Sequence, residues 1–238
     1  MNTAESILKT FSARRILDVA TGNGNFVKFL LERIKDYDEI IGIDTSEKAN
    51  SAFSEAFKDK PKIHCLLMDA QHMDFPDASF DSVCISNSLH HMQDLEPVLA
   101  EMKRVLRPGG NFIVAEMFRD NQAETQMTHV LIHHWLAAVD TAKGVTHHET
   151  FTRQQIFDII NILGLIDVVF DDSSDLNEDP KDPETVKSLI DTVDQTLKRI
   201  EGLAGEATLR ERGLELRQRI EEIGFHGATS LLSIGKKP

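Results

Sequence analysis

A group of histidines in the middle of the chain has the residue type and spacing for metal or proton chemistry. Five of the ten histidines lie within residues 127–149: His129, His133, His134, His147 and His148. Residues four apart share a helix face, so His129 and His133 could bind one metal ion, with His147, His148 or Glu149 completing its shell. A neutral histidine, with a usual pKa of about 6.5, could instead be a general base, and His129, His133 and His148 are the candidates. In a third interpretation these side chains only pack or line a polar pocket.

A second chemical pattern lies near the start of the chain, in the segment ILDVATGNGNF (16–26). It is typical of a strand that runs into a glycine turn and then a helix. Gly22 and Gly24 allow the backbone to approach a ligand closely, and the following helix offers free N–H groups. Asp44 ends the next predicted strand, 20 residues after Gly24, where its carboxylate can accept hydrogen bonds from both hydroxyls of a ribose. The spacing therefore favours a ligand that contains adenosine.

The same segment argues against a dinucleotide. The dinucleotide fingerprint requires a third small residue where this chain has Val27, so an NAD-dependent oxidoreductase is disfavoured. Asp69 and Ala70 end the third predicted strand, where a carboxylate and an adjacent backbone N–H could bind the edge of an adenine. A methyl donor built on adenosine has no pyrophosphate to bind, and it fits this pattern better.

The order of the apolar segments predicts the scaffold that positions these residues. Apolar runs typical of strands occur at 14–20, 38–44, 61–69, 80–87 and 110–117. Helical patterns lie between them, at 26–35, 47–58 and 94–106. Strands that alternate with helices indicate βαβ units and a parallel sheet. Further along, we expect helices over 121–142 and 152–163 and strands over 165–170 and 228–235.

The segment between the last two predicted strands is unusually long. After an acidic, turn-rich stretch at 171–184, apolar residues recur at helical spacing before and after the turn GLAG. We expect a helical hairpin inserted over 171–226, in a domain formed by 1–170 and 227–238. The predicted fold class is α/β: a Rossmann-like, seven-stranded, mostly parallel sheet with helices on both faces, an antiparallel last strand and this inserted hairpin.

Five motifs make the chain resemble the class I S-adenosylmethionine-dependent methyltransferases, especially the ubiquinone- and menaquinone-biosynthesis C-methyltransferases. In order they are LDVATGNGNF, GIDTS, MDAQHMDFPDASFDSV, SNSLHHM and MKRVLRPGGNFIVAE, and they cover residues 14–117 well. The resemblance implies S-adenosylmethionine as cofactor, with Asp44 on its ribose and Asp69 and Ala70 on its adenine. The implied cofactor site comprises Asp18, Ala20, Gly22, Gly24, Asp44, Thr45, Asp69, Ala70 and Asn87. His90 and His91, in SNSLHHM, match a run that is common in the family and are expected to line the pocket.

The implied reaction is in-line methyl transfer to a nucleophile on a small-molecule acceptor, aided by a histidine base or a histidine-bound divalent metal. The alternatives are a protein that binds S-adenosylmethionine without catalysis and the disfavoured oxidoreductase. Strand 165–170 is expected to run with its neighbours, so the insertion leaves the sheet at the edge where ligands bind. We therefore expect 171–226 to form a lid over the active site, with a homodimer interface as its alternative role.

Charge and hydropathy narrow the partners further. The formal net charge of −13 repels a phosphate backbone, so we do not expect nucleic acid as a partner. The chain contains no apolar run near the length of about 18 residues that a membrane span needs, and its first residues lack the apolar core of a signal peptide. We expect a cytoplasmic protein with no membrane partner.

Overall fold

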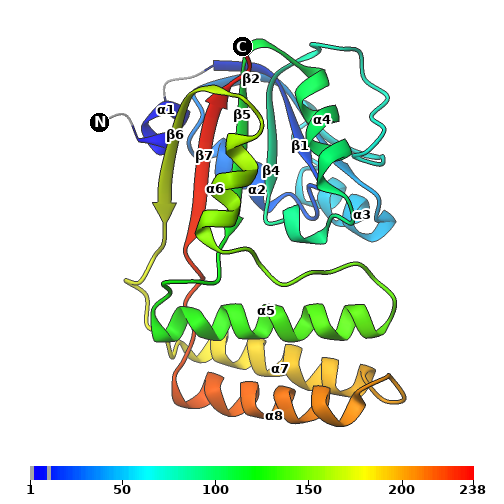
Figure 1. The fold of residues 1–238 in the computed structure, drawn as a ribbon, viewed down its shortest axis with the longest axis vertical. Coiled ribbons are helices and arrows are strands. Elements are labelled where there is room, and N and C mark those ends of the chain that lie inside the picture. Colours follow the sequence, from blue (N-terminus) through cyan, green and yellow to red (C-terminus); the bar gives the residue numbers. More distant parts are fainter. Residues whose placement is uncertain (1–2, 10–11) are drawn as a thin grey trace.

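The computed structural model describes residues 3–9 and 12–238, and within them seven strands form one sheet (Figure 1). The strands are β1 (Ser12–Val19), β2 (Asp36–Asp44), β3 (Ile63–Leu67), β4 (Phe80–Ser86), β5 (Leu106–Met117), β6 (Ile166–Ser173) and β7 (Ser230–Lys236). Their order across the sheet is β3-β2-β1-β4-β5-β7-β6. Neighbours pair in parallel, except that β7 is antiparallel to both β5 and β6. This arrangement confirms the predicted mostly parallel sheet with an antiparallel last strand.

Helices cover both faces of the sheet. Adjacent residues of a strand point to opposite faces, so Leu17 lies in one buried apolar cluster and Ile16 in the other. The cluster around Leu17 includes residues of α4 (Leu95–Val105) and α6 (Arg153–Asn161). The cluster around Ile16 includes residues of α1 (Ala4–Leu8), α2 (Asn25–Leu31) and α3 (Glu47–Ala56). The sheet is therefore buried between two helical layers, as the repeated strand–helix pattern predicts.

A third group of helices lies beyond the carboxyl ends of the parallel strands (Figure 1). α5 (Glu124–Ala142) follows β5, while α7 (Pro183–Arg199) and α8 (Glu206–Glu222) lie between β6 and β7 in the chain. The three helices share an apolar cluster that contains fully buried Trp135, whose indole N–H donates a hydrogen bond to the Leu209 carbonyl oxygen at 2.7 Å. Gly213 lets α8 approach this ring, because a Cβ there would lie 2.6 Å from Trp135 Cζ2. α7 and α8 thus form a helical hairpin that packs on α5.

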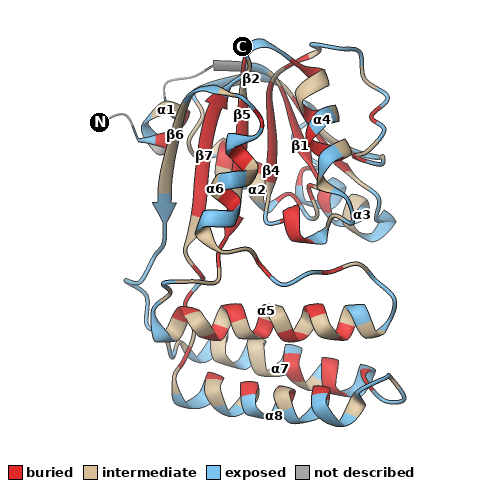
Figure 2. Ribbon diagram, in the orientation of Figure 1, coloured by how far each residue is buried: buried red, intermediate tan, exposed pale blue. Residues whose placement is uncertain are grey.

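The surface of this helical layer away from the sheet is polar. Figure 2 shows exposed residues along the sides of α7 and α8 that do not face α5. Leu214 is the large apolar side chain that these two helices leave exposed. In the described part of the chain, every helix is too short or too polar to cross a membrane.

The strand boundaries differ from the prediction by up to four residues, and the differences at β3 and β5 have structural causes. β3 is shorter than the predicted 61–69, and as an edge strand it leaves Leu66 and Leu67 exposed. β5 begins four residues before the predicted start at Gly110, because Leu106 already pairs with Phe80 of β4. The residues that follow Leu106 form an irregularity in that pairing before the regular ladder resumes.

Candidate functional site

A cavity of about 490 Å³ opens at the carboxyl ends of β1, β2 and β4. Its volume lies within the range of small-molecule sites, and its position at the carboxyl edge of a parallel sheet is where α/β folds bind ligands. Six of the predicted cofactor residues line it: Asp18, Ala20, Gly22, Asp44, Thr45 and Asn87. His91 and Met92 line the same cavity from the segment after β4. The structure therefore brings together residues that are up to about 70 positions apart in the chain.

The other three predicted cofactor residues lie outside the lining of this cavity. Gly24 is the N-cap of α2 with φ of 81°, and a Cβ there would lie 2.4 Å from Phe57 Cε2, so this glycine serves packing against α3. Asp69 is exposed, and its Oδ1 accepts a hydrogen bond from the Gln71 N–H at 2.9 Å. Ala70 is buried in the apolar cluster around Leu17.

Gly22 and Asp44 form the edge of the cavity together. Gly22 has φ of 56°, and a Cβ there would meet no atom within 4 Å, so its backbone is open to a ligand. Its N–H donates a hydrogen bond to Asp44 Oδ2 at 3.0 Å, while Asp44 Oδ1 accepts from the Ser46 N–H at 2.8 Å. The carboxylate is thereby fixed at the end of β2, where it can still accept hydrogen bonds from a ligand.

Asp18 contributes a buried carboxylate to the cavity. Its Oδ2 accepts a hydrogen bond from the Thr21 hydroxyl at 2.5 Å, and its Oδ1 is buried without a hydrogen-bond partner. Burial raises the pKa of Asp18 to about 7, the Thr21 hydrogen bond opposes that rise, and the negative charge of Asp44 adds to it. A buried acceptor that lacks a donor is costly, so this atom fits a ligand that carries a cationic N–H group.

The backbone at the cavity is strained at two non-glycine residues. Ala20 has φ of 52° and Asn87 has φ of 45°, values that side-chain-bearing residues seldom adopt. Asn87 is held there by two hydrogen bonds to β5: its N–H donates to the Ala115 carbonyl, and its Oδ1 accepts from the Met117 N–H. Such strain clusters at ligand-binding sites, which agrees with the position of both residues on the cavity wall.

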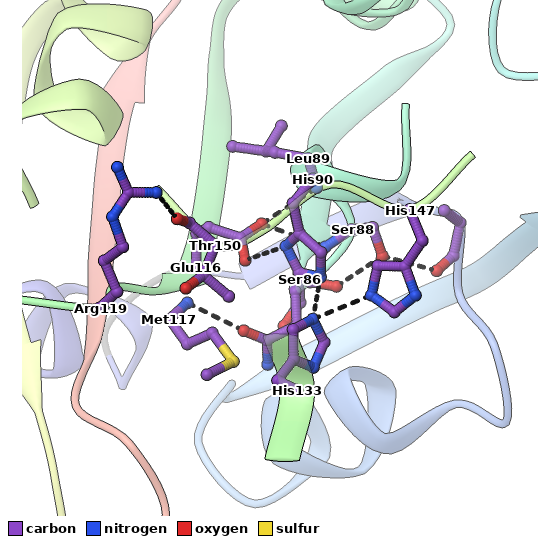
Figure 3. A network of polar contacts seen from close by, with 12 residues as sticks. Ser86, Ser88, Leu89, His90, Glu116, Met117, Arg119, His133, His147 and Thr150 are labelled. Carbon is purple, nitrogen blue, oxygen red and sulfur yellow. Dashed lines mark hydrogen bonds and ion pairs between the residues drawn. The ribbon is translucent and has the colours of Figure 1, made fainter. Parts of the chain in front are cut away.

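Beside this cavity, three histidine side chains meet (Figure 3). His133 Nε2 lies 2.9 Å from His90 Nε2 and 3.1 Å from His147 Nε2. His90 belongs to the short 3-10 helix η1 (Leu89–His91), His133 to α5, and His147 to the loop after α5. With His91, they form a group whose potential metal-ligand atoms all lie within 4.8 Å of one another. His91 also lines the cavity, so the cluster and the cavity are adjacent.

The carboxylates of Glu116 and Asp140 contact the Nδ1 atoms of His90 and His147, on the side of each ring away from His133. Glu116 Oε1 lies 2.9 Å from His90 Nδ1, and both side chains are fully buried. Glu116 Oε2 accepts hydrogen bonds from the N–H groups of Ser88 and Leu89 at 3.1 and 3.0 Å. Asp140 Oδ2 lies 2.9 Å from His147 Nδ1. Each of the two outer histidines is therefore oriented by an acidic side chain from β5 or α5.

Burial keeps two of the imidazoles in the cluster uncharged. It lowers the pKa of His133 to about 2, with further lowering by His90 and His147. Burial also lowers the pKa of His91 to about 3, and His90 and His147 add to that shift. Both imidazoles are neutral at physiological pH, so their unprotonated nitrogens are available as electron-pair donors.

The cluster differs from the set predicted from the sequence. His133 and His147 were predicted ligands and lie in it, whereas His129 and His148 are not among its members. His129 Nδ1 accepts a hydrogen bond from the Ala228 N–H at 2.9 Å, because that side of α5 faces the segment before β7. His148 is exposed, and its backbone N–H donates to the His90 carbonyl.

Three other residues of the region have different roles from those the sequence indicated. His134 lies outside the cluster, and its Nε2 contacts the Thr150 hydroxyl at 2.9 Å. His90 was expected only to line the pocket, although its position in SNSLHHM at the end of the fourth strand was a usable signal. Glu116 was read only as part of an apolar strand, and its burial beside His90 depends on the pairing of β4 with β5.

A larger cavity of about 920 Å³ lies elsewhere, between Arg33 and the acidic 171–179 segment. Its lining contains none of the predicted site residues. The smaller cavity remains the better candidate, because it combines the glycine turn, an unpaired buried carboxylate oxygen and the carboxyl ends of parallel strands.

Comparison with known proteins finds relatives for the segment that lines this cavity. A methyltransferase-domain family model matches residues 17–114. A demethylmenaquinone methyltransferase of Deinococcus radiodurans is 40% identical over 106 residues, which are 44% of each chain. A ubiquinone/menaquinone biosynthesis C-methyltransferase of Paraburkholderia phytofirmans is 35% identical over 103 residues, 43% of this chain and 42% of that protein. The chain thus spans less than half the length of these curated relatives.

The whole fold also has counterparts among solved structures. A putative methyltransferase of Bacillus halodurans matches with a TM-score of 0.61 over 99% of both chains, at 16% sequence identity. At that identity the likeness concerns the fold, and it extends through the helical layer that the sequence matches leave uncovered. Residues 17–114 are thus similar to a methyltransferase domain and to methyltransferases of ubiquinone and menaquinone biosynthesis, and the whole chain is similar in fold to a putative methyltransferase.

Proposed function

We propose that this protein transfers the methyl group of S-adenosylmethionine to a small-molecule acceptor. The observation that carries the proposal is the unpaired, buried Oδ1 of Asp18 beside the open backbone of Gly22 and the carboxylate of Asp44. Asp18 would accept from the ammonium of the methionine portion, and Asp44 from the ribose hydroxyls. When bound, S-adenosylmethionine supplies an electrophilic methyl group on a sulfonium.

The acceptor is proposed to be a small molecule with a quinol-like or phenolic ring. The formal net charge of −13 disfavours nucleic acid, and two matched relatives are named for steps on quinone precursors. The family match ends at residue 114, before α5 and the helical hairpin, so these helices would set a specificity that the relatives' names do not describe.

The helical layer is proposed to act as a lid. α5, α7 and α8 lie across the edge of the sheet where the cavity opens, so they would exclude water and align the acceptor for in-line transfer (Figure 1). Their apolar residues are already buried against one another, and the exposed residues of α7 and α8 (Figure 2) are mostly polar, with Leu214 the large apolar exception. That polarity favours a lid over a homodimer interface, which would be more apolar.

The experiment that tests the function combines cofactor binding with turnover. S-adenosylhomocysteine should bind the wild-type protein, and Asp44→Ala should weaken that binding roughly 100-fold, since charge-assisted hydrogen bonds are lost. Asp38→Ala is the matched control, because Asp38 lies at the other end of β2 and pairs with Arg14. Isothermal titration gives both affinities, and NAD should show no binding.

Turnover separates an enzyme from a binding protein. Labelled S-adenosylmethionine should methylate at least one quinol or phenol in a panel that also contains thiols and amines. Tight binding of S-adenosylhomocysteine with no labelled product from any acceptor would favour the non-catalytic alternative. If the wild-type protein does not bind S-adenosylhomocysteine, the proposed methyltransferase function is wrong.

The affinity for S-adenosylhomocysteine is expected to rise with pH. Since the pKa of Asp18 is raised to about 7 in the free protein, its carboxyl is protonated below that pH and must lose the proton to bind an ammonium group. Between about pH 5.5 and pH 7.5 the affinity should rise roughly 20-fold and then level off. Titrations in two buffers of different ionisation enthalpy should show proton release at the lower pH. Asp18→Asn should bind weakly and lose this pH dependence, whereas a pH-independent wild type would contradict the role of Asp18.

A further inference from the structure

The three histidines beside the cavity offer nitrogen atoms that all lie within 4.8 Å of one another. His133 Nε2 lies 2.9 Å from His90 Nε2 and 3.1 Å from His147 Nε2, so it contacts both of the other rings (Figure 3). A tetrahedral site with metal–nitrogen bonds of about 2.0–2.1 Å separates its nitrogens by about 3.3 Å. The two separations from His133 are slightly shorter and the third lies within 4.8 Å, so a small movement of the rings would accommodate a metal ion.

The outer carboxylates fix which nitrogens face inward. Glu116 accepts from two backbone N–H groups through Oε2, so it is an acceptor and His90 Nδ1 carries the hydrogen that faces its Oε1. His147 Nδ1 faces Asp140 Oδ2 at 2.9 Å in the same way, and can donate its hydrogen to that carboxylate. When each of these rings carries a single N–H, at Nδ1, Nε2 of His90 and of His147 both present lone pairs to the cluster.

With these tautomers, the two Nε2···Nε2 contacts of His133 have at most one hydrogen atom between them. His133 Nε2 carries one hydrogen at most, and it contacts lone pairs on both sides. At least one of the two nitrogen–nitrogen contacts is therefore lone pair against lone pair, which is repulsive. A cation at the centre would convert all three lone pairs into ligands. The carboxylate–histidine pairs on the outside are also the arrangement that orients histidine ligands in metal sites.

We propose that His90, His133 and His147 bind one divalent cation of the zinc type, and that its remaining coordination position faces the cofactor cavity. Three imidazoles suit zinc and its first-row neighbours, and three protein ligands leave a position for another molecule. His91 connects the two sites: its ring lies 4.0 Å from that of His147, and it lines the cavity.

The role of the open position rests on the proposed methyltransferase function. An acceptor with a hydroxyl or thiol group could coordinate there through oxygen or sulfur, beside the methyl donor. The cation would lower the pKa of that group, so its proton would pass to water and the acceptor would be held as the stronger, anionic nucleophile. The substrate class is therefore an acceptor with an ionisable oxygen or sulfur at or next to the methylated atom.

Direct metal binding tests the site. Untagged wild-type protein, stripped with a chelator and dialysed, should bind one Zn²⁺ per chain in competition with a chromophoric chelator. Co²⁺ should give the visible absorption of a four- or five-coordinate site. His133→Ala and His147→Ala should each weaken Zn²⁺ binding by roughly 100-fold or more, since each removes one of three ligands. His129→Ala and His148→Ala are the matched controls, and both should bind Zn²⁺ within about threefold of wild type because neither side chain belongs to the cluster.

A second variant tests the tautomer without removing a ligand. In Glu116→Gln, the amide oxygen can keep the Ser88 and Leu89 hydrogen bonds while the amide N–H₂ faces His90 Nδ1. The hydrogen of His90 would then move to Nε2 and block metal binding. We expect Zn²⁺ affinity to fall about 10–100-fold with the melting curve largely retained, and Asp140→Asn should act similarly on His147.

Several outcomes would overturn the proposal. Wild-type protein that takes up no stoichiometric Zn²⁺ or Co²⁺ would do so, as would Zn²⁺ binding that survives both His133→Ala and His147→Ala. If the wild-type protein binds no metal and the His133→Ala variant loses turnover, His133 would instead be assigned the role of a base. S-adenosylhomocysteine titrations on the same stripped samples keep the two proposals apart, because the cofactor site shares no residue with the three ligands and should bind without metal.

Discussion

Trp135→Ala is expected to lower the free energy of unfolding by about 3–5 kcal/mol, the cost of truncating a large, fully buried aromatic side chain. The ring lies in the apolar cluster that joins α5 to α7 and α8, and its N–H bonds to the Leu209 carbonyl. Truncation would leave a cavity between the three helices and a buried carbonyl without its donor. Urea denaturation, followed by circular dichroism, measures the loss.

Trp135→Phe separates the two contributions. It keeps most of the ring packing and removes the hydrogen bond to Leu209, so the loss should be about 1–2 kcal/mol. If the helical layer is a lid, Trp135→Ala should keep the wild-type affinity for S-adenosylhomocysteine and lose most of its turnover. A loss of stability below about 1 kcal/mol in Trp135→Ala would show that α7 and α8 do not pack on α5 as described.

Gly24→Ala and Gly22→Ala should have opposite consequences, although both glycines have positive φ in the same turn. At Gly24 the new methyl group would lie 2.4 Å from Phe57 and 2.9 Å from Phe53, so stability should fall by about 2–4 kcal/mol from overpacking and backbone strain together. At Gly22 the methyl group would meet no protein atom and would project into open space at the cofactor cavity. Stability should fall by only about 1 kcal/mol, while binding of S-adenosylhomocysteine should be largely lost.

Thermal melts with and without S-adenosylhomocysteine distinguish the pair in one experiment. Gly24→Ala should melt early but still shift upward when the ligand is added. Gly22→Ala should melt near the wild type and fail to shift. Equal losses of stability in the two variants would contradict the different surroundings of Gly22 and Gly24.

The scaffold and the cofactor cavity could be predicted because their signals are local in the sequence. Each strand is a short apolar run, and the residues at its carboxyl end, such as Asp18, Asp44 and Asn87, must gather at one edge of a parallel sheet. The roles of Gly22 and Gly24 could not be separated in this way, since only packing against Phe53 and Phe57 makes them different.

The histidine cluster required contacts that no local pattern specifies. Helical spacing groups His129 with His133, but a hydrogen bond from Ala228, about 100 residues further along the chain, engages His129 instead. His90 joins His133 only because α5 lies across the end of β4, and Glu116 reaches His90 only because β5 pairs with β4. Buried carboxylates inside apolar strands are thus the residues that sequence reasoning should inspect more closely.

The pairing of β6 with β7 has a consequence for how the chain tolerates its helical insertion. Ser173 pairs directly with Ser230, so residues 174–229 form a loop whose two ends are joined by the sheet itself. Loop-closure entropy grows slowly, by about 0.6 kcal/mol for each doubling of length, so this loop costs only roughly 2–3 kcal/mol more than a four-residue turn. The core of the three helices can offset a cost of that size. The segment between Ser173 and Ser230 can therefore vary in length at little cost to the sheet, provided that it still covers the Trp135 face of α5.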